Sequence, residues 1–139
     1  MEKSALYKIK LAVLWLFFAV STSAGMVLIF MMPGYIGEIM GGELEGVPIS
    51  EGYLLVLAVT WLIPLTMAFL SLTLKDSINR WANLIVGMAL TALQILSSVF
   101  KLLIRGQLAL GLIEVSRTVV AALIAWYAWK WPKQQIGGD

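Results

Sequence analysis

Two ionisable side chains interrupt an otherwise apolar stretch near the end of the chain. Glu114 and Arg117 are the only charged residues between positions 108 and 129. A charge at the centre of a membrane helix costs about 2.5–3.5 kcal/mol, whereas residues three positions apart on a helix can pair and lower that cost. The spacing therefore predicts either an internal salt bridge or a polar binding site.

A second set of polar residues lies on the preceding apolar stretch, 81–100. Gln94, Ser98 and Lys101 recur at steps of three and four, so a helix places them on one face. From the predicted span ends, and at 1.5 Å per residue, Gln94 and Glu114 lie about 9–10 Å below the outer boundary, as does Thr60 of an earlier span. The candidate ligand-binding residues are Gln94, Glu114, Arg117, Thr60 and Lys101.

Three interpretations of this cluster remain open on the sequence alone. The pair can be a structural salt bridge that locks the last span against the third through Gln94. It can instead line an outward-facing pocket for a small cationic or amphipathic ligand. A carboxylate that carries protons during transport is the weakest interpretation, because the guanidinium of Arg117 would keep Glu114 ionised.

The composition excludes several classes of function. The 139 residues contain no cysteine and no histidine, which excludes thiol redox chemistry, disulfides and the metal or catalytic sites built on those side chains. No phosphate-binding glycine loop or nucleophile motif occurs. A net charge of +2 without a basic patch does not favour nucleic acid. We therefore expect no enzyme activity, no cofactor and no metal.

The hydropathy predicts an all-α, integral membrane four-helix bundle that forms a single domain over residues 1–139. Sixty per cent of the residues are hydrophobic and 13% are charged, which a water-soluble fold of this size could not bury. A membrane crossing needs about 20 apolar residues. The four predicted spans cover residues 11–32, 53–74, 81–100 and 108–129. Since the turn between the second and third is short, we expect these two spans to be antiparallel neighbours.

The distribution of charge predicts that both termini are cytoplasmic, in a multi-pass protein of the cell membrane. Basic residues gather on one side, as the positive-inside rule requires of the cytoplasmic side. These residues are Lys3, Lys8, Lys10, Lys75, Arg80, Lys130 and Lys133. The apolar stretch that follows the N-terminal lysines fits an uncleaved first helix better than a signal peptide. An aromatic belt is expected on the same side, formed by Trp81, Trp126, Trp129 and Trp131.

The long outer loop, residues 33–52, is rich in glycine and contains four glutamates and no basic residue. Its glycines and prolines argue against a long helix, although a brief helical turn at 35–40 can lie on the membrane surface. The glutamates suit a solvated loop, since no spacing for a divalent cation occurs. Alternatively, the loop folds back to neutralise Lys101, Arg105 or Arg117.

Four segments of the chain resemble a family of small, uncharacterised four-span prokaryotic membrane proteins. The resemblance implies four spans and an acidic residue at Glu114 in the last one, but it implies no activity. The segments are NRWANLI at 79–85, WYAWKW at 126–131, LAVLWLF at 11–17 and IPLTM at 63–67.

The leading hypothesis is a non-enzymatic membrane protein with a structural, accessory or partner-binding role and an intramembrane polar cluster. The alternative is a small transporter or ligand-binding protein that uses the cluster as its site. The lipid bilayer is the expected partner in either case. A second copy of the chain or another membrane protein can also pack on the small-residue faces, and a small ligand remains open.

Overall fold

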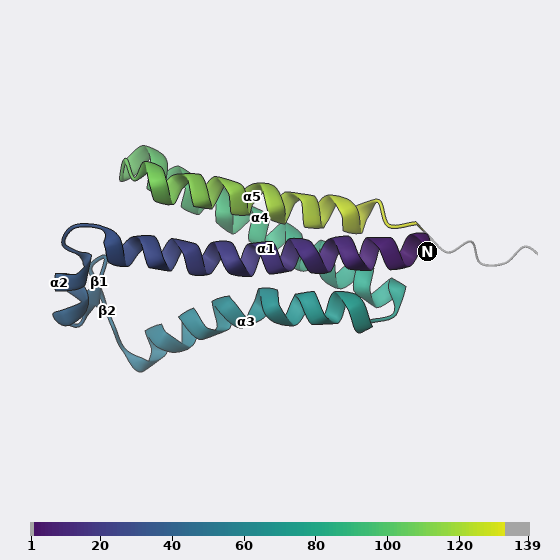
Figure 1. The fold of residues 1–139 in the computed structure, drawn as a ribbon, viewed down its shortest axis with the longest axis horizontal. Helices are drawn as coiled ribbons and strands as arrows, with labels where there is room; N and C mark the ends of the chain where they lie inside the picture. Colours follow the sequence, from purple (N-terminus) through teal and green to yellow (C-terminus); the bar gives the residue numbers. More distant parts are fainter. Residues whose placement is uncertain (1, 133–139) are drawn as a thin grey trace, which may run out of the picture.

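The computed structural model describes residues 2–132 and consists of four long helices with a short helix and a small hairpin at one end (Figure 1). Each long helix is sufficiently long and apolar to cross a membrane, so the predicted all-α membrane fold is confirmed. In chain order the elements are α1 (Lys3–Met31), α2 (Tyr35–Met40), β1 (Glu43–Leu44), β2 (Val47–Pro48), α3 (Glu51–Thr73), α4 (Asp76–Val99), the π-helix η1 (Phe100–Ile104) and α5 (Leu108–Trp129).

The two ends of the bundle differ in their connections. α1 begins, α5 ends and the α3–α4 turn lies at one end, which we call the terminal end (Figure 1). α2 and the β1–β2 hairpin cover the other, which we call the hairpin end. The helices extend beyond the predicted spans, most at Lys3 and Asp76, because backbone hydrogen bonds continue into the interface after the apolar run has stopped.

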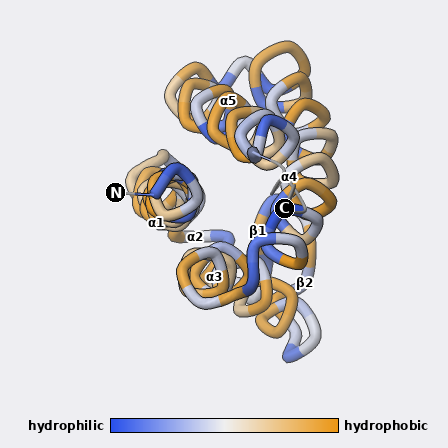
Figure 2. The backbone as a smooth tube through the Cα atoms, turned by 90° about the vertical axis from the view of Figure 1, so that its right-hand side faces the viewer, coloured by the Kyte–Doolittle hydropathy of each residue, from blue (hydrophilic) through white to orange (hydrophobic). Residues whose placement is uncertain are grey.

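The packing of α3 differs from the sequence-based prediction. α3 packs mainly on α1, whereas α4 packs mainly on α5; viewed end-on, α1, α5, α4 and α3 follow one another around the bundle (Figure 2). The buried residues of α3 are Pro64, Met67, Ala68 and Ser71, all in its terminal half. α3 and α4 are therefore close neighbours only near their turn, because a short connection fixes the ends of two helices without fixing their whole length.

The hairpin half of α3 bends away from the bundle (Figure 1). None of the residues from Glu51 to Ile63 is buried. The bend falls near Pro64, which cannot donate a hydrogen bond to the carbonyl of Thr60 and whose ring crowds that carbonyl. The apolar core consequently lies in the terminal half, where Trp15, Phe18 and Ile124 are almost fully buried.

The interface between α4 and α5 is built from small and polar residues, among them Ser98 of the predicted polar face. A Cβ atom on Gly87 would lie 3.0 Å from the backbone nitrogen of Ala125, so a larger residue would push the two backbones slightly apart. Further along the same face, the hydroxyls of Ser98 and Thr118 form a hydrogen bond of 3.1 Å. Close backbones and interhelical hydrogen bonds are the usual means of helix association in membranes.

A buried network that the sequence analysis did not single out joins three helices in the terminal half. Asn79 and Asn83 of α4 are both 0% exposed. The Nε1 of Trp15 donates to Asn83 Oδ1 at 2.6 Å, and the Ser71 hydroxyl donates to the same oxygen at 3.2 Å. Asn83 Nδ2 donates to Asn79 Oδ1 at 2.7 Å, and Asn79 Nδ2 donates to the Ser71 carbonyl at 2.7 Å. In the sequence, the sign of this network was a pair of asparagines four residues apart near the end of a predicted span.

The terminal end is closed by charged and aromatic contacts. Lys8 Nζ lies 3.0 Å from Asp76 Oδ1 and donates to the Leu74 carbonyl at 2.9 Å. Trp131 does not join an aromatic belt, because its ring packs 5.8 Å from that of Tyr7 and is 4% exposed. The other three tryptophans predicted for the belt are exposed, as expected: Trp81, Trp126 and Trp129.

Replacing Asn83 with alanine is expected to lower the free energy of unfolding by about 1–3 kcal/mol, because buried donors on Trp15 and Ser71 lose their acceptor. Thermal denaturation in detergent measures the effect. Thr73→Ala is the matched control, since the exposed Thr73 hydroxyl bonds only within its own helix. Equal melting temperatures for the two variants would contradict a stabilising role for the network.

Candidate functional site

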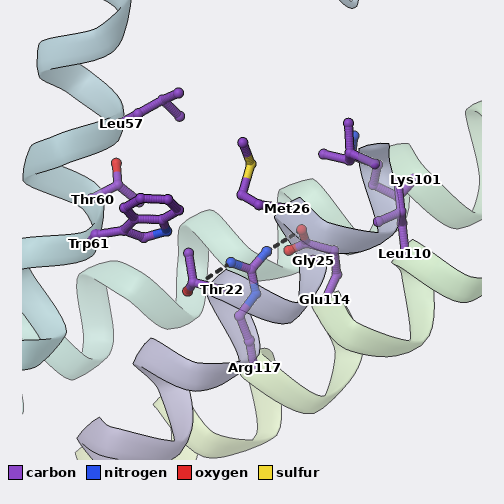
Figure 3. Close-up of a pocket in the computed structure, with 11 residues that line it drawn as sticks. Thr22, Gly25, Met26, Leu57, Thr60, Trp61, Lys101, Leu110, Glu114 and Arg117 are labelled. Carbon is purple, nitrogen blue, oxygen red and sulfur yellow. Dashed lines mark hydrogen bonds and ion pairs between the residues drawn. The ribbon is translucent and has the colours of Figure 1, made fainter. Parts of the chain in front are cut away.

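A cleft of about 150 Å³ opens between α1, α3 and α5 in the hairpin half of the bundle (Figure 3). It lies where α3 bends away from α1, so the same proline-associated bend that leaves α3 unburied also separates the walls. The lining residues are Thr22, Gly25, Met26 and Ile29 of α1, Leu57, Thr60 and Trp61 of α3, Leu110, Glu114 and Arg117 of α5, and Lys101 of η1.

The carboxylate of Glu114 and the guanidinium of Arg117 meet on the α5 side of the cleft, across from Thr60 and Trp61 (Figure 3). Arg117 Nη2 donates to Glu114 Oε1, and Arg117 Nη1 donates to the Thr22 hydroxyl at 3.1 Å. The guanidinium also lies 5.8 Å from the centre of the Phe18 ring. One helical turn of α5 therefore carries an ion pair that is anchored on α1.

The ion pair leaves two buried polar atoms unused. Glu114 is 8% exposed, and its second oxygen, Oε2, has no hydrogen-bond partner among residues 2–132. The same holds for Nε of Arg117 within the described part of the chain. A polar atom left unpaired in apolar surroundings costs several kcal/mol. Both atoms are buried beneath the wall of the cleft, so a polar group in the cleft reaches them only when the ion pair turns towards it.

Four of the five candidate residues line this cleft: Thr60, Lys101, Glu114 and Arg117. The Thr60 hydroxyl donates to its own helix, at the Val56 carbonyl, over 2.8 Å, so it keeps lone pairs to accept a bond from a ligand. Gln94 is not part of the lining. It lies on α4 between Gly87 and Ser98, on the face that packs on α5, where its Oε1 is buried without a partner among the described residues.

Lys101 reaches the cleft because the connection after α4 is helical. The predicted span ends at residue 100, but the Arg105 amide donates to the carbonyl of Phe100 over 3.0 Å, a bond across five residues that makes η1 a π-helix. The wider turn changes the direction in which successive side chains point. Lys101 is partly buried at the cleft, whereas Arg105 is exposed and lies over the Phe100 ring.

The acidic loop folds back onto Lys101, as one of the predicted alternatives required. Lys101 Nζ lies 2.7 Å from Glu45 Oε1. The same oxygen accepts a hydrogen bond from the Tyr35 hydroxyl at 3.0 Å, and Gln107 Nε2 donates to that hydroxyl at 2.8 Å. This network ties α2, the hairpin and the start of α5 together above the cleft.

Glu45 occupies a backbone conformation that glutamate seldom adopts. It forms the two-residue turn between β1 and β2 with Gly46, and the φ angles are 52° and 78°. Positive φ at a residue with a side chain costs of order 1–3 kcal/mol and persists where other contacts fix it. Burial acts to raise the pKa of Glu45, but the hydrogen bond and charge of Lys101 outweigh it and hold this pKa below its ordinary value. The carboxylate stays ionised and keeps the turn attached.

These observations define a helical, multi-spanning membrane protein with a polar cleft between its helices. The chain belongs to a family of unknown function (DUF6326), whose model matches residues 2–137. The resemblance to an uncharacterised family is thereby confirmed. No curated protein and no solved structure matches the chain.

Replacing Glu114 with glutamine is expected to lower the free energy of unfolding by about 3–5 kcal/mol, because Arg117 loses its charged partner in a buried position. Thermal denaturation in detergent, followed by circular dichroism, measures the loss. Glu43→Gln, at an exposed position of the hairpin, should leave the melting temperature unchanged. A Glu114→Gln protein as stable as this control would show that the ion pair does not hold α5 in place.

Proposed function

We propose that this protein binds a small amphipathic molecule that enters the cleft from the lipid bilayer. The observation that supports the proposal best is the buried carboxylate of Glu114, which directs one oxygen to Arg117 and leaves the other without a partner in the described chain. A salt bridge with a purely structural role would be more stable with both oxygens bonded. The spare oxygen, in a cleft with apolar walls, is a recognition group.

The walls of the cleft suit a ligand that comes from lipid. Met26 and Ile29 on α1 face Leu57 and Trp61 on α3, and these side chains are partly or largely exposed, with Trp61 at 41%. Because the hairpin half of α3 stands apart from the bundle, the entrance lies between two membrane-crossing helices. Apolar walls with a few polar groups at the end are typical of small-molecule sites.

Binding without catalysis agrees best with the residues of the cleft. A general acid or base needs a side chain that is free to contact the proton it transfers. Glu114 is paired with Arg117, and Lys101 is paired with Glu45. The lining includes no serine or cysteine that could serve as a nucleophile beside a base. We infer that the cleft holds its ligand and leaves it chemically unchanged.

We further propose that the terminal end faces the cytoplasm and that the membrane is the cell membrane. α1 begins and α5 ends on this side (Figure 1). Lys8, Lys75 and Lys130 lie there with further basic residues, and Lys133 adds to the sequence pattern although it lies outside the described residues. The hairpin end carries the glutamates of the loop. Such an asymmetry places the basic side in the cytoplasm.

The proposed orientation can be tested with single cysteines, because the chain contains none of its own. We expect Glu43→Cys at the hairpin end to react with a membrane-impermeant maleimide added to intact spheroplasts. Ser77→Cys at the terminal end should react only after permeabilisation. Both positions are exposed. The reverse labelling pattern would invert the topology.

The cleft itself can be tested with a cysteine at Met26 in protein reconstituted in bilayers. We expect Met26→Cys to react with the small uncharged reagent methyl methanethiosulfonate at least about tenfold faster than Val27→Cys, because thiolates form only where polar groups or water replace lipid. Val27 is the matched control, since it is the next residue on α1 and is 57% exposed on the helix surface. Equal and slow rates would mean that the cleft is closed in the membrane, and the proposed function would fail.

A further inference from the structure

The cleft also specifies what kind of polar group it accepts. We propose that it takes the uncharged head group of an amphiphile, such as a hydroxyl or an amide, which both donates and accepts hydrogen bonds, while the apolar tail leaves between α1 and α3. This inference rests on the proposed function and adds the chemical class of the ligand. It follows from the charge balance, the unused hydrogen-bonding atoms and the size of the cleft.

The charges around the cleft cancel in pairs. Arg117 is paired with Glu114, and Lys101 is paired with Glu45 at 2.7 Å. The lining contains no further charged residue. A cation would meet Arg117 beside Glu114, and an anion would meet Glu114 beside Arg117, so neither gains a net attraction. A net charge brought to this depth stays uncompensated, which is costly in a membrane.

The two buried, unpaired atoms favour a ligand with both hydrogen-bonding functions, which they meet when the ion pair turns towards the cleft. Glu114 Oε2 can only accept, and Arg117 Nε can only donate; neither has a partner in residues 2–132. An ammonium group offers donors alone, and a carboxylate or sulfonate offers acceptors alone. A hydroxyl or an amide supplies one of each, so it can satisfy both atoms without adding charge.

The dimensions of the cleft limit the head group and direct the tail. A volume of about 150 Å³ equals that of a cavity that holds a benzene-sized molecule, so a bulky head group such as phosphocholine does not fit. The apolar contacts available to the remainder of the ligand come from Met26, Ile29, Leu57 and Trp61. These side chains lead from the ion pair towards the lipid side of α3.

The test uses three amphiphiles with the same eight-carbon chain and different head groups. They are 1-octanol, octylammonium and octanesulfonate, each added to reconstituted Met26→Cys protein at the same membrane concentration. The measured quantity is the protection of the thiol from the methanethiosulfonate reagent. We expect octanol to protect at about tenfold lower concentration than either ion, which corresponds to the unfavourable transfer of one uncompensated charge close to the interface.

A second variant reverses the selectivity if charge balance is its cause. Glu114→Gln keeps the shape of the side chain but leaves the charge of Arg117 uncompensated, so in the Met26→Cys background it should favour octanesulfonate over octanol. Stronger protection of the parent protein by either ion, or unchanged selectivity in Glu114→Gln, overturns the assigned head group but not the binding cleft. A reactive thiol that none of the three amphiphiles protects overturns the proposed binding function itself.

Discussion

Polar groups at membrane depth have to find their partners inside the protein, because lipid offers none. In this chain that requirement is met differently in the two halves of the bundle. In the terminal half, the amide nitrogen and oxygen of both asparagines of α4 are hydrogen-bonded, and Trp15 and Ser71 complete the network. In the hairpin half, the Glu114–Arg117 pair satisfies part of its bonding capacity and leaves a carboxylate oxygen and a guanidinium nitrogen without a partner among residues 2–132.

The course of α3 produces this difference. Its buried residues, from Pro64 to Ser71, attach it to α1 beside the asparagine network. Before Pro64, on the side of the hairpin end, the helix carries large exposed apolar side chains, such as Leu55 and Leu62. This half of α3 does not pack closely on the other helices. In water, such a gap would collapse under the hydrophobic effect. In a bilayer no such force acts between helices, so a lateral cleft can persist beside a charged pair.

The hairpin end shows how charge holds an irregular segment in place. The loop is too rich in glycine to form a long helix, and its turn puts Glu45 at positive φ. Lys101, on the π-helix, fixes the Glu45 carboxylate; the Tyr35 hydroxyl donates to the same carboxylate and accepts a hydrogen bond from Gln107. The contact neutralises the charge of Lys101 near the membrane boundary and holds α2 and the hairpin above the cleft. The outer loop and the cleft are therefore parts of one arrangement.

The sequence by itself determined the number and order of the long helices, because hydropathy over about 20 residues reports the thickness of the hydrocarbon core directly. It also placed Glu114 and Arg117 close enough to pair, since three residues on one helix fix their separation, but it left the role of the pair open. It did not determine which helices pack together, the hairpin at Glu45, the asparagine network or the position of Gln94 outside the cleft. Those depend on the bend of α3 and the π-turn at Lys101, and only the tertiary structure decided them, because small rotations of a helix redirect every side chain beyond them.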